Sequence, residues 1–166
     1  MRAPGAFACL AILSILFTAL SSTACGKPVD LTKGLQIDAV ATGWFDAGIF
    51  QGKNKLVPTF AFTLKNVSDQ TLVTLQVNAL FRRVGEKDEW GSGFLPAVGS
   101  SGLKPGASTD RLVIKSQLGY TGTESRQEML KNVVFVDAKV DIFVKYGSTQ
   151  WVKFGEYPIA RQLITP

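Results

Sequence analysis

Few side chains in this chain of 166 residues could perform chemistry, and histidine is absent from it. Without histidine, Ser-His-Asp and Cys-His nucleophilic sites and the usual zinc sites cannot form. The densest group of carboxylates, Glu86, Asp88 and Glu89, lies within one predicted turn. A glycosidase pair must instead face its substrate from two sides of a cleft. We therefore expect no enzyme activity, no catalytic residue, no metal site and no cofactor.

Cys25 follows an N-terminal stretch with the pattern of an export signal. Arg2 supplies a short positive start, residues 6–20 form an apolar run of 15 residues, and small residues occupy positions 21–24. A membrane-spanning helix needs about 20 apolar residues, so this run is short for a retained span. We predict that residues 1–24 are a signal peptide that is removed on export.

The residues Ser22-Thr23-Ala24-Cys25 resemble the lipidation box of bacterial lipoproteins. The resemblance implies that Cys25 is lipidated on its sulfur and becomes the first residue of the mature chain. It also implies an outer-membrane location, because Gly26 follows where aspartate would resemble the inner-membrane retention signal. The box departs from the family at Ser22, where an aliphatic residue is usual. Ordinary cleavage after Ala24 is the alternative, and it would give a secreted or periplasmic soluble protein.

The cysteine count favours lipidation. Cys9 lies inside the leader, so Cys25 would be the only cysteine of the mature chain. An internal disulfide is then impossible, and a free thiol in an oxidising compartment is prone to mispairing unless it is capped. A lipid on Cys25 would cap the thiol and hold the protein at a membrane.

The remaining chain is predicted to be one domain, residues 35–166, joined to the lipidated N-terminus by a short tether at residues 25–34. Without Arg2, 17 basic residues stand against 13 acidic residues, and the excess is scattered along the chain. A nucleic-acid-binding protein would show a basic stripe or a recognisable reading motif. We therefore expect no nucleic-acid partner.

An alternation of apolar and polar residues dominates the predicted domain and indicates half-buried β-strands. A segment at 43–51 is ambiguous between loop and strand, and a short helix over 124–130, capped by Thr123, is the one helix expected. Val134 and Val136 are expected to face the core at the start of the longest strand, with Phe135 and Phe143 on its other face. The strands are expected near residues 35–41, 60–65, 75–82, from 90, 112–114, 134–146 and after 150.

This pattern predicts an all-β fold: an antiparallel Ig-like β-sandwich of about seven strands, with one short helix before the C-terminal hairpin. Residues 60–69, 77–81 and 103–106 resemble the strand, Asn-x-Ser-Asp turn, strand and Pro-Gly turn of Ig-like envelope domains of the FxLYD type. Leu80-Phe81-Arg82-Arg83 stands where that signature would be. The resemblance implies the sandwich fold and a location outside the cytoplasm, and it carries no catalytic residue.

The C-terminal hairpin indicates a surface for a partner. A two-residue loop would place Lys153 among core residues, whereas a three-residue loop pairs Val144 with Val152 and Ile142 with Phe154, so the second register is preferred. It leaves an aromatic and cationic patch on the outer face: Phe143, Lys145, Trp151 and Lys153. The simpler interpretation is that the short helix or the 43–51 segment covers these rings, because large apolar side chains are usually covered.

The sequence thus predicts a lipid-anchored protein of the bacterial envelope that acts as a non-catalytic binding or scaffolding module. Its partners would be the membrane, through the N-terminal lipid, and an envelope protein. The alternative is a secreted or anchored carrier whose sandwich opens a cavity for an apolar ligand.

Overall fold

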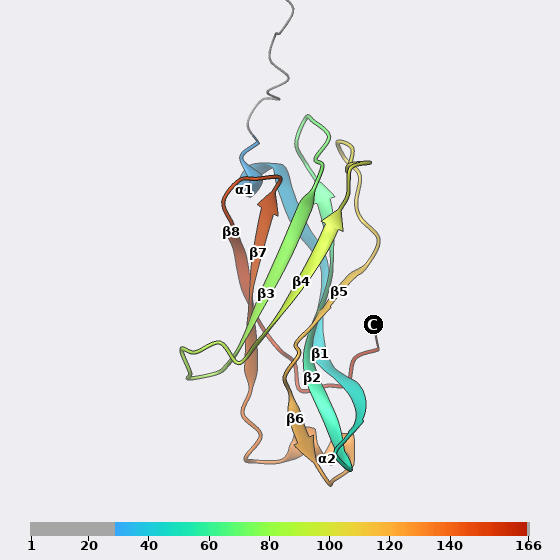
Figure 1. Ribbon diagram of the computed structural model, residues 1–166, viewed down its shortest axis with the longest axis vertical. Helices are drawn as coiled ribbons and strands as arrows, with labels where there is room; N and C mark the ends of the chain where they lie inside the picture. The colour runs from blue at the N-terminus through green and yellow to red at the C-terminus, as the bar shows by residue number, and fades with distance from the viewer. Residues whose placement is uncertain (1–28, 166) are drawn as a thin grey trace, which may run out of the picture.

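The structure is a computed structural model that describes residues 29–165, and it consists of two antiparallel β-sheets packed face to face (Figure 1). The described elements, in chain order, are α1 (Leu31–Gly34), β1 (Leu35–Phe50), β2 (Lys53–Asn66), β3 (Leu75–Arg83), β4 (Gly91–Val98), β5 (Leu112–Lys115), β6 (Tyr120–Gly122), α2 (Arg126–Lys131), β7 (Ala138–Tyr146) and β8 (Val152–Pro158).

One sheet has the order β1-β2-β5, with β6 also paired to β2, and the other has the order β4-β3-β7-β8. The predicted all-β antiparallel sandwich is confirmed, with eight strands in the described residues where about seven were expected. The glycine-rich sequence Gly119-Tyr120-Thr121-Gly122 predicts a turn, which is wrong, because residues 120–122 form the short strand β6. We call the end that carries α1 and the β7–β8 loop the upper end, and the end that carries α2 and β6 the lower end (Figure 1).

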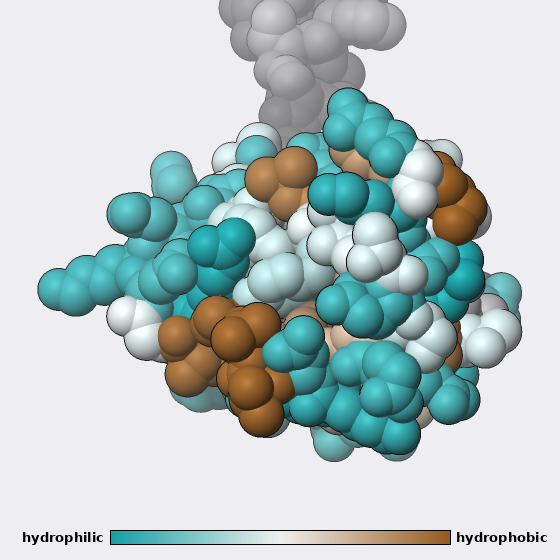
Figure 2. Space-filling view, turned by 90° about the horizontal axis from the view of Figure 1, so that it is seen from below, coloured by the Kyte–Doolittle hydropathy of each residue, from teal (hydrophilic) through white to brown (hydrophobic). Residues whose placement is uncertain are grey.

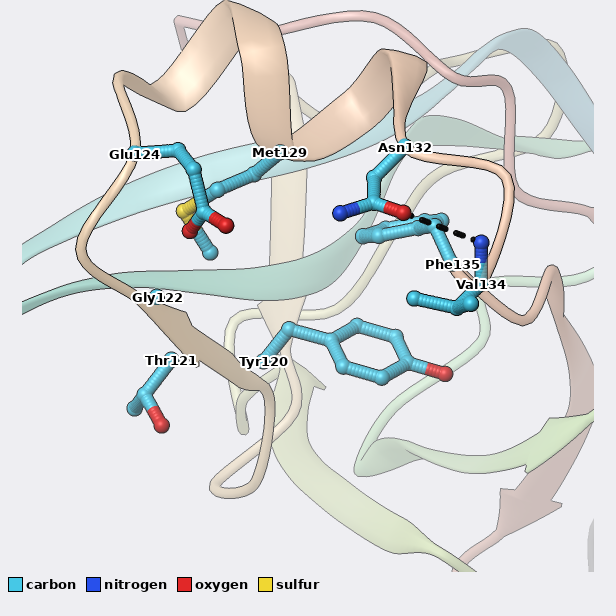
Figure 3. Close-up of a pocket in the computed structure, with 8 residues that line it drawn as sticks. All are labelled: Tyr120, Thr121, Gly122, Glu124, Met129, Asn132, Val134 and Phe135. Carbon is cyan, nitrogen blue, oxygen red and sulfur yellow. Dashed lines mark hydrogen bonds between the residues drawn. The ribbon is translucent and has the colours of Figure 1, made fainter.

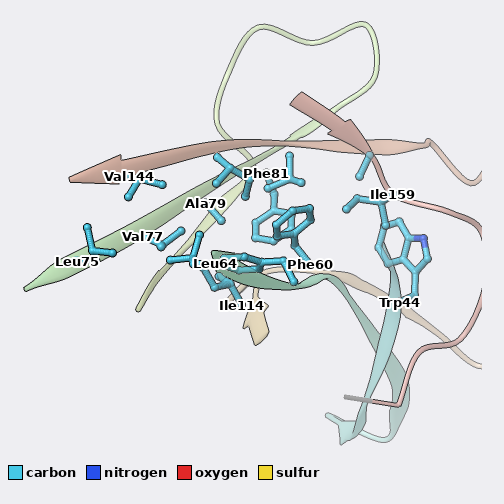
Figure 4. Packing of buried hydrophobic residues seen from close by; sticks show 14 of the residues in the cluster. Trp44, Phe60, Leu64, Leu75, Val77, Ala79, Phe81, Ile114, Val144 and Ile159 are labelled. Atoms are coloured by element: carbon cyan, nitrogen blue, oxygen red, sulfur yellow. The ribbon is translucent and has the colours of Figure 1, made fainter. Parts of the chain in front are cut away.

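The core lies between the sheets and follows the predicted alternation most closely in β3. Leu75, Val77, Ala79 and Phe81 are fully buried. Figure 4 shows Val77 and Ala79 pointing across the interface toward Leu64 and Phe60 of β2. Each large apolar side chain removed from water in this way contributes about 1.5–3 kcal/mol to the free energy of unfolding.

Strand β1 continues through residues 43–50 of the ambiguous segment, and a bulge changes which side chains face the core. The register with β2 shifts between Asp38 and Ala41, and Ala39 has a φ of 50°. A bulge moves later side chains to the opposite face. The alternation of residues 35–41 predicts that Ala39 shares the core face with Leu35 and Ile37. This prediction is wrong, because Ala39 is exposed, while Trp44 is fully buried beyond the bulge.

Strand β7 begins at Ala138, so the prediction that it starts at Val134 is wrong. Val134 and Val136 are exposed, and Phe135, which was expected on the outer face, is buried in the core. Arg161 explains this local structure, because its guanidinium donates to the carbonyl oxygen of Phe135 (2.7 Å) and lies over the Phe135 ring. These contacts hold residues 132–137 as a loop.

The folded domain begins before residue 35. The prediction that the tether extends to residue 34 is therefore wrong for its last residues, which form α1. Asp30 caps α1, its carboxylate accepting a hydrogen bond from the backbone N–H of Thr32 (3.1 Å). Leu31 and Gly34 are buried, and the carbonyl oxygen of Gly34 accepts bonds from the N–H groups of Val67 and Ser68. The chain is therefore fixed to the domain from Asp30 onward.

Helix α2 forms close to the predicted position but is capped by Ser125 and not by Thr123. The Ser125 hydroxyl accepts a hydrogen bond from the N–H of Glu128 (3.3 Å), an arrangement that satisfies an otherwise free backbone donor. An ion pair between Arg126 and Asp46 of β1 (2.5 Å) fixes the helix at the lower end. The Arg126 hydrogen bond lowers the pKa of the Asp46 carboxyl.

Candidate functional site: the outer face of the β4-β3-β7-β8 sheet

The predicted patch lies on the outer face of the β4-β3-β7-β8 sheet, which faces the viewer in Figure 1. The hairpin register is correct at Val144, which pairs with Val152. A bulge follows, however, and Ile142 pairs with Gly155 instead of Phe154. The bulge absorbs the one-residue mismatch, so that Ile142 stays buried in the core.

All four predicted patch residues lie on the outer face, although their contacts differ from the expectation. Phe143 pairs directly with Lys153, and both side chains lie on the outer face. The ammonium of Lys145 lies 5.8 Å from the centre of the Trp151 ring, within the range of a cation–π interaction. The side chain of Lys153 turns toward Asp141, with its ammonium 2.6 Å from the carboxylate.

Neither segment that was expected to cover these rings does so. Helix α2 lies at the lower end, and the 43–50 segment belongs to β1 in the other sheet. Trp151 is 39% exposed and Phe143 is half-buried. The interpretation that a second layer covers the patch is therefore wrong.

Phe94 of β4 is a patch residue that the sequence analysis missed. It is 58% exposed, and its ring meets that of Trp151 edge to face, with centroids 6.4 Å apart. Phe94 pairs with Asn78 of β3, and Asn78 pairs in turn with Phe143 of β7. The alternation along β4 could have indicated that Phe94 faces outward. The position of Phe94 beside the hairpin, however, depends on the strand order of the sheet. We use "outer patch" for Phe94, Phe143, Lys145, Trp151 and Lys153.

A ladder of charges lies beside the outer patch on the same face. Asp141 is buried and forms ion pairs with Arg82 of β3 and Lys153 of β8. A buried carboxylate needs such partners, because desolvation of an unpaired charge is costly. Glu156 pairs with Lys139 (3.1 Å), and this hydrogen bond lowers the pKa of the Glu156 carboxyl.

A second feature, an aromatic cluster, occupies the lower end of the sandwich. Trp44 lies at its centre, with ring centroids 4.7 Å from Phe135, 5.6 Å from Tyr120 and 6.1 Å from Trp90. The Arg83 guanidinium lies 4.9 Å from the Trp90 ring. Burial raises the pKa of the Tyr120 hydroxyl, which donates a hydrogen bond to the carbonyl oxygen of Val136 (2.9 Å).

An open cavity of about 280 Å³ lies between β6, α2 and the 132–137 loop. Figure 3 shows the apolar side chains of Tyr120, Met129 and Phe135 together with two polar ones at the rim, Glu124 and Asn132. The Asn132 side-chain oxygen accepts a hydrogen bond from the N–H of Val134 (3.0 Å). The cavity is at the end of the sandwich, while the space between the sheets is filled by core side chains.

The lower end also exposes apolar side chains. Figure 2 shows hydrophobic residues gathered on one side of this end, bordered by hydrophilic ones. Val133 and Val134, which lie next to the cavity, are 95% and 76% exposed. Ile49 and Phe50, at the turn between β1 and β2, are exposed as well.

The carboxylates of the predicted acidic turn, Glu86, Asp88 and Glu89, are exposed in the β3–β4 loop. Glu86 forms an ion pair with Arg83 (3.5 Å). Across residues 29–165, no group of three or more acidic or cysteine side chains is arranged to hold a metal ion.

Cys25 and the predicted signal peptide lie outside the described residues. Within the part of the chain that the structure describes, no helix has the length and apolar character needed to cross a bilayer.

No protein-family model and no curated protein matches the chain. Among solved structures, the chain is similar to the X-ray structure of a Northeast Structural Genomics Consortium target, with 9% sequence identity and a TM-score of 0.43. The similarity covers 78% of this chain and 89% of the other.

Proposed function

We propose that the protein is a lipid-anchored, non-catalytic binding or scaffolding module of the bacterial cell envelope, held at a membrane through Cys25. The leader that precedes Cys25, and the resemblance of its last residues to a lipidation box, support the anchor. The observation that carries the proposal furthest is the position of α1, because the folded domain begins five residues after Cys25.

The short link restricts how the domain stands at a membrane. Val29 is the fourth residue after Cys25, and four residues span at most about 14 Å when fully extended. A lipid on Cys25 would therefore keep the upper end of the sandwich close to the bilayer. The lower end, with its cavity and exposed valines, would lie farther from the point of attachment.

The side chains of the outer patch are suited to contact with a partner. The outer patch exposes aromatic rings, which are enriched at contact surfaces, and the ammonium of Lys145 lies over one of them. The carrier hypothesis would instead use the lower cavity, where Tyr120, Met129 and Phe135 offer an apolar lining. An apolar molecule that remains bound through native purification would favour the carrier.

Replacing the anchoring cysteine tests the proposal. We expect Cys25→Ser to abolish acyl labelling and to move the protein from the membrane fraction to the soluble fraction, because serine offers no thiol for the lipid. The matched control is Cys9→Ser, which changes a cysteine inside the leader and should leave labelling and fractionation unchanged. The measurement is metabolic labelling with a fatty-acid analogue, followed by membrane fractionation.

Membrane association of the Cys25→Ser variant at the wild-type level, without acyl labelling of either protein, would overturn the anchor. Equal loss of labelling in both variants would show that the effect belongs to export and not to Cys25. A soluble wild-type protein whose mature chain starts at Cys25 would favour ordinary cleavage after Ala24.

A further inference from the structure

We propose that the outer patch binds the anionic headgroups of the membrane that holds the chain, so that the anchored domain leans on the lipid surface with its β4-β3-β7-β8 sheet. This inference rests on the proposed anchoring through Cys25. It assigns a partner to the outer patch, namely an anionic lipid surface.

The position of the patch relative to the start of the domain is the first argument. Helix α1 packs beside β8, and Thr32 of α1 lines a shallow hollow together with Lys153 and Phe154 of β8. Trp151 directly precedes β8, next to the hairpin loop at the upper end (Figure 1). The chain therefore enters the domain beside the patch, and a short link to a lipid would bring this face near the bilayer.

The chemistry of the patch is the second argument. Trp151 and Phe94 are exposed and touch each other, although they come from opposite edges of the sheet. Tryptophan and other amphipathic rings are enriched at the level of lipid headgroups, where an apolar body and a polar edge are both satisfied. Lys145, beside Trp151, places a cation at the same level.

The charge of this face is the third argument. Four cationic side chains on the face stand against two carboxylates, Asp141 and Glu156. Arg82 and Lys139 lie opposite each other at the far end of β3 and are ion-paired with these carboxylates, whereas Lys145 and Lys153 lie in the half of the face nearer Trp151. The acidic β3–β4 loop lies at the far end of β3 from the patch. Basic side chains near an anionic leaflet are attracted to it, whereas the acidic loop is repelled. This asymmetry favours contact by the half of the face that carries Trp151.

Tryptophan fluorescence of the full protein, purified from membranes and reconstituted in vesicles, tests the inference. The vesicles contain brominated phosphatidylcholine, a quencher of nearby indoles, with or without phosphatidylglycerol. Trp151 is the most exposed of three tryptophans, and Trp44 is fully buried. We expect quenching of up to about a third of the emission in anionic vesicles, since one ring in three would lie at headgroup depth. High salt should reverse it, because salt screens exposed charges.

Variants identify the side chains responsible. Trp151→Phe should remove the composition-dependent quenching, and Lys145→Gln should shift the equilibrium toward the unquenched orientation by about fivefold. The matched control is Lys115→Gln on the other sheet, where Lys115 lies over the Phe45 ring at 3.3 Å. This variant removes the same charge from an equivalent cation–aromatic pair and should leave quenching unchanged.

Equal and weak quenching in neutral and anionic vesicles, with the protein still bound to both, would overturn the inference and leave the anchor intact. The failure of the anchor would look different, because the protein would then not float with neutral vesicles at all. Quenching that Lys115→Gln removes as fully as Lys145→Gln would also overturn it, because the contact would then not belong to this face.

Discussion

Replacement of Trp44 by alanine is expected to lower the free energy of unfolding by about 3–5 kcal/mol, among the largest effects of any single substitution in this domain. Trp44 is fully buried and stands at the centre of the lower aromatic cluster, in ring contact with Tyr120 and Phe135. Its backbone also pairs with the C-terminal segment, through the carbonyl oxygen of Gln162 and the N–H of Ile164. Alanine would leave a cavity where β1, β6 and the 132–137 loop meet.

Urea unfolding, followed by far-UV circular dichroism, measures the loss. The control is Phe94→Ala, which removes another aromatic ring from an exposed position and should change the free energy of unfolding by well under 1 kcal/mol. Trp44→Phe should fall between the two, because the ring is partly kept and the buried indole N–H, which has no hydrogen-bond partner, is removed. A loss below 1 kcal/mol for Trp44→Ala would contradict the packing described for the lower end.

Replacement of Asn66 by alanine is expected to cost about 2–4 kcal/mol, because a fully buried hydrogen-bonding side chain is lost. The Asn66 amide donates to the carbonyl oxygens of Gln70 (2.8 Å) and Leu103 (2.7 Å). Its side-chain oxygen accepts from the N–H (2.9 Å) and the hydroxyl (2.6 Å) of Ser68. Asn66 therefore ties the β2–β3 turn to the loop that follows β4.

Asn66→Asp separates hydrogen bonding from size. A carboxylate keeps the contacts with Ser68 but cannot donate to the two carbonyl oxygens, so we expect a loss at least as large as that of alanine. Asn78→Ala, at a half-buried position on the outer face, is the control and should cost less than 1 kcal/mol. Chemical denaturation of the three variants gives the comparison, and equal stability of Asn66→Asp and wild type would contradict this role of Asn66.

The elements that sequence predicts well are those whose alternation is uninterrupted. Strand β3 follows a strict period of two from Leu75 to Phe81, and all four of its inward side chains are buried. The prediction fails where the backbone departs from that period, as at the Ala39 bulge in β1 and the bulge opposite Ile142 in β8. A single inserted residue reverses the faces of a strand, and no local residue pattern announced either bulge.

The start of β7 fails for a different reason. Val134 and Val136 continue the alternation of the strand, so their sequence alone indicates that they face the core. Tertiary contacts override this local pattern, because Arg161, from the C-terminal segment, binds backbone carbonyl oxygens of the loop and Phe135 fills the space beside Trp44. Such contacts join residues far apart in the chain and cannot be read from spacing.

The candidate site was predicted in part. The hairpin placed Lys145 and Trp151 together because they are close in sequence and share a face. Phe94 was not predicted, since its strand β4 is separated from the hairpin by β3. The ion pair between Lys153 and Asp141 was not predicted either. The pairing of residues within the hairpin was therefore predictable. The contribution of Phe94 from β4 could be predicted only with knowledge of the strand order.

The mass of the N-terminal peptide of the mature protein, isolated from the membrane fraction of the native cells, tests the central claim most directly. The proposed anchoring predicts a chain that begins at Cys25, with acyl chains on that residue and none elsewhere. A mature chain beginning at Cys25 with a free thiol, or a chain that retains residues of the 1–24 leader, would contradict it.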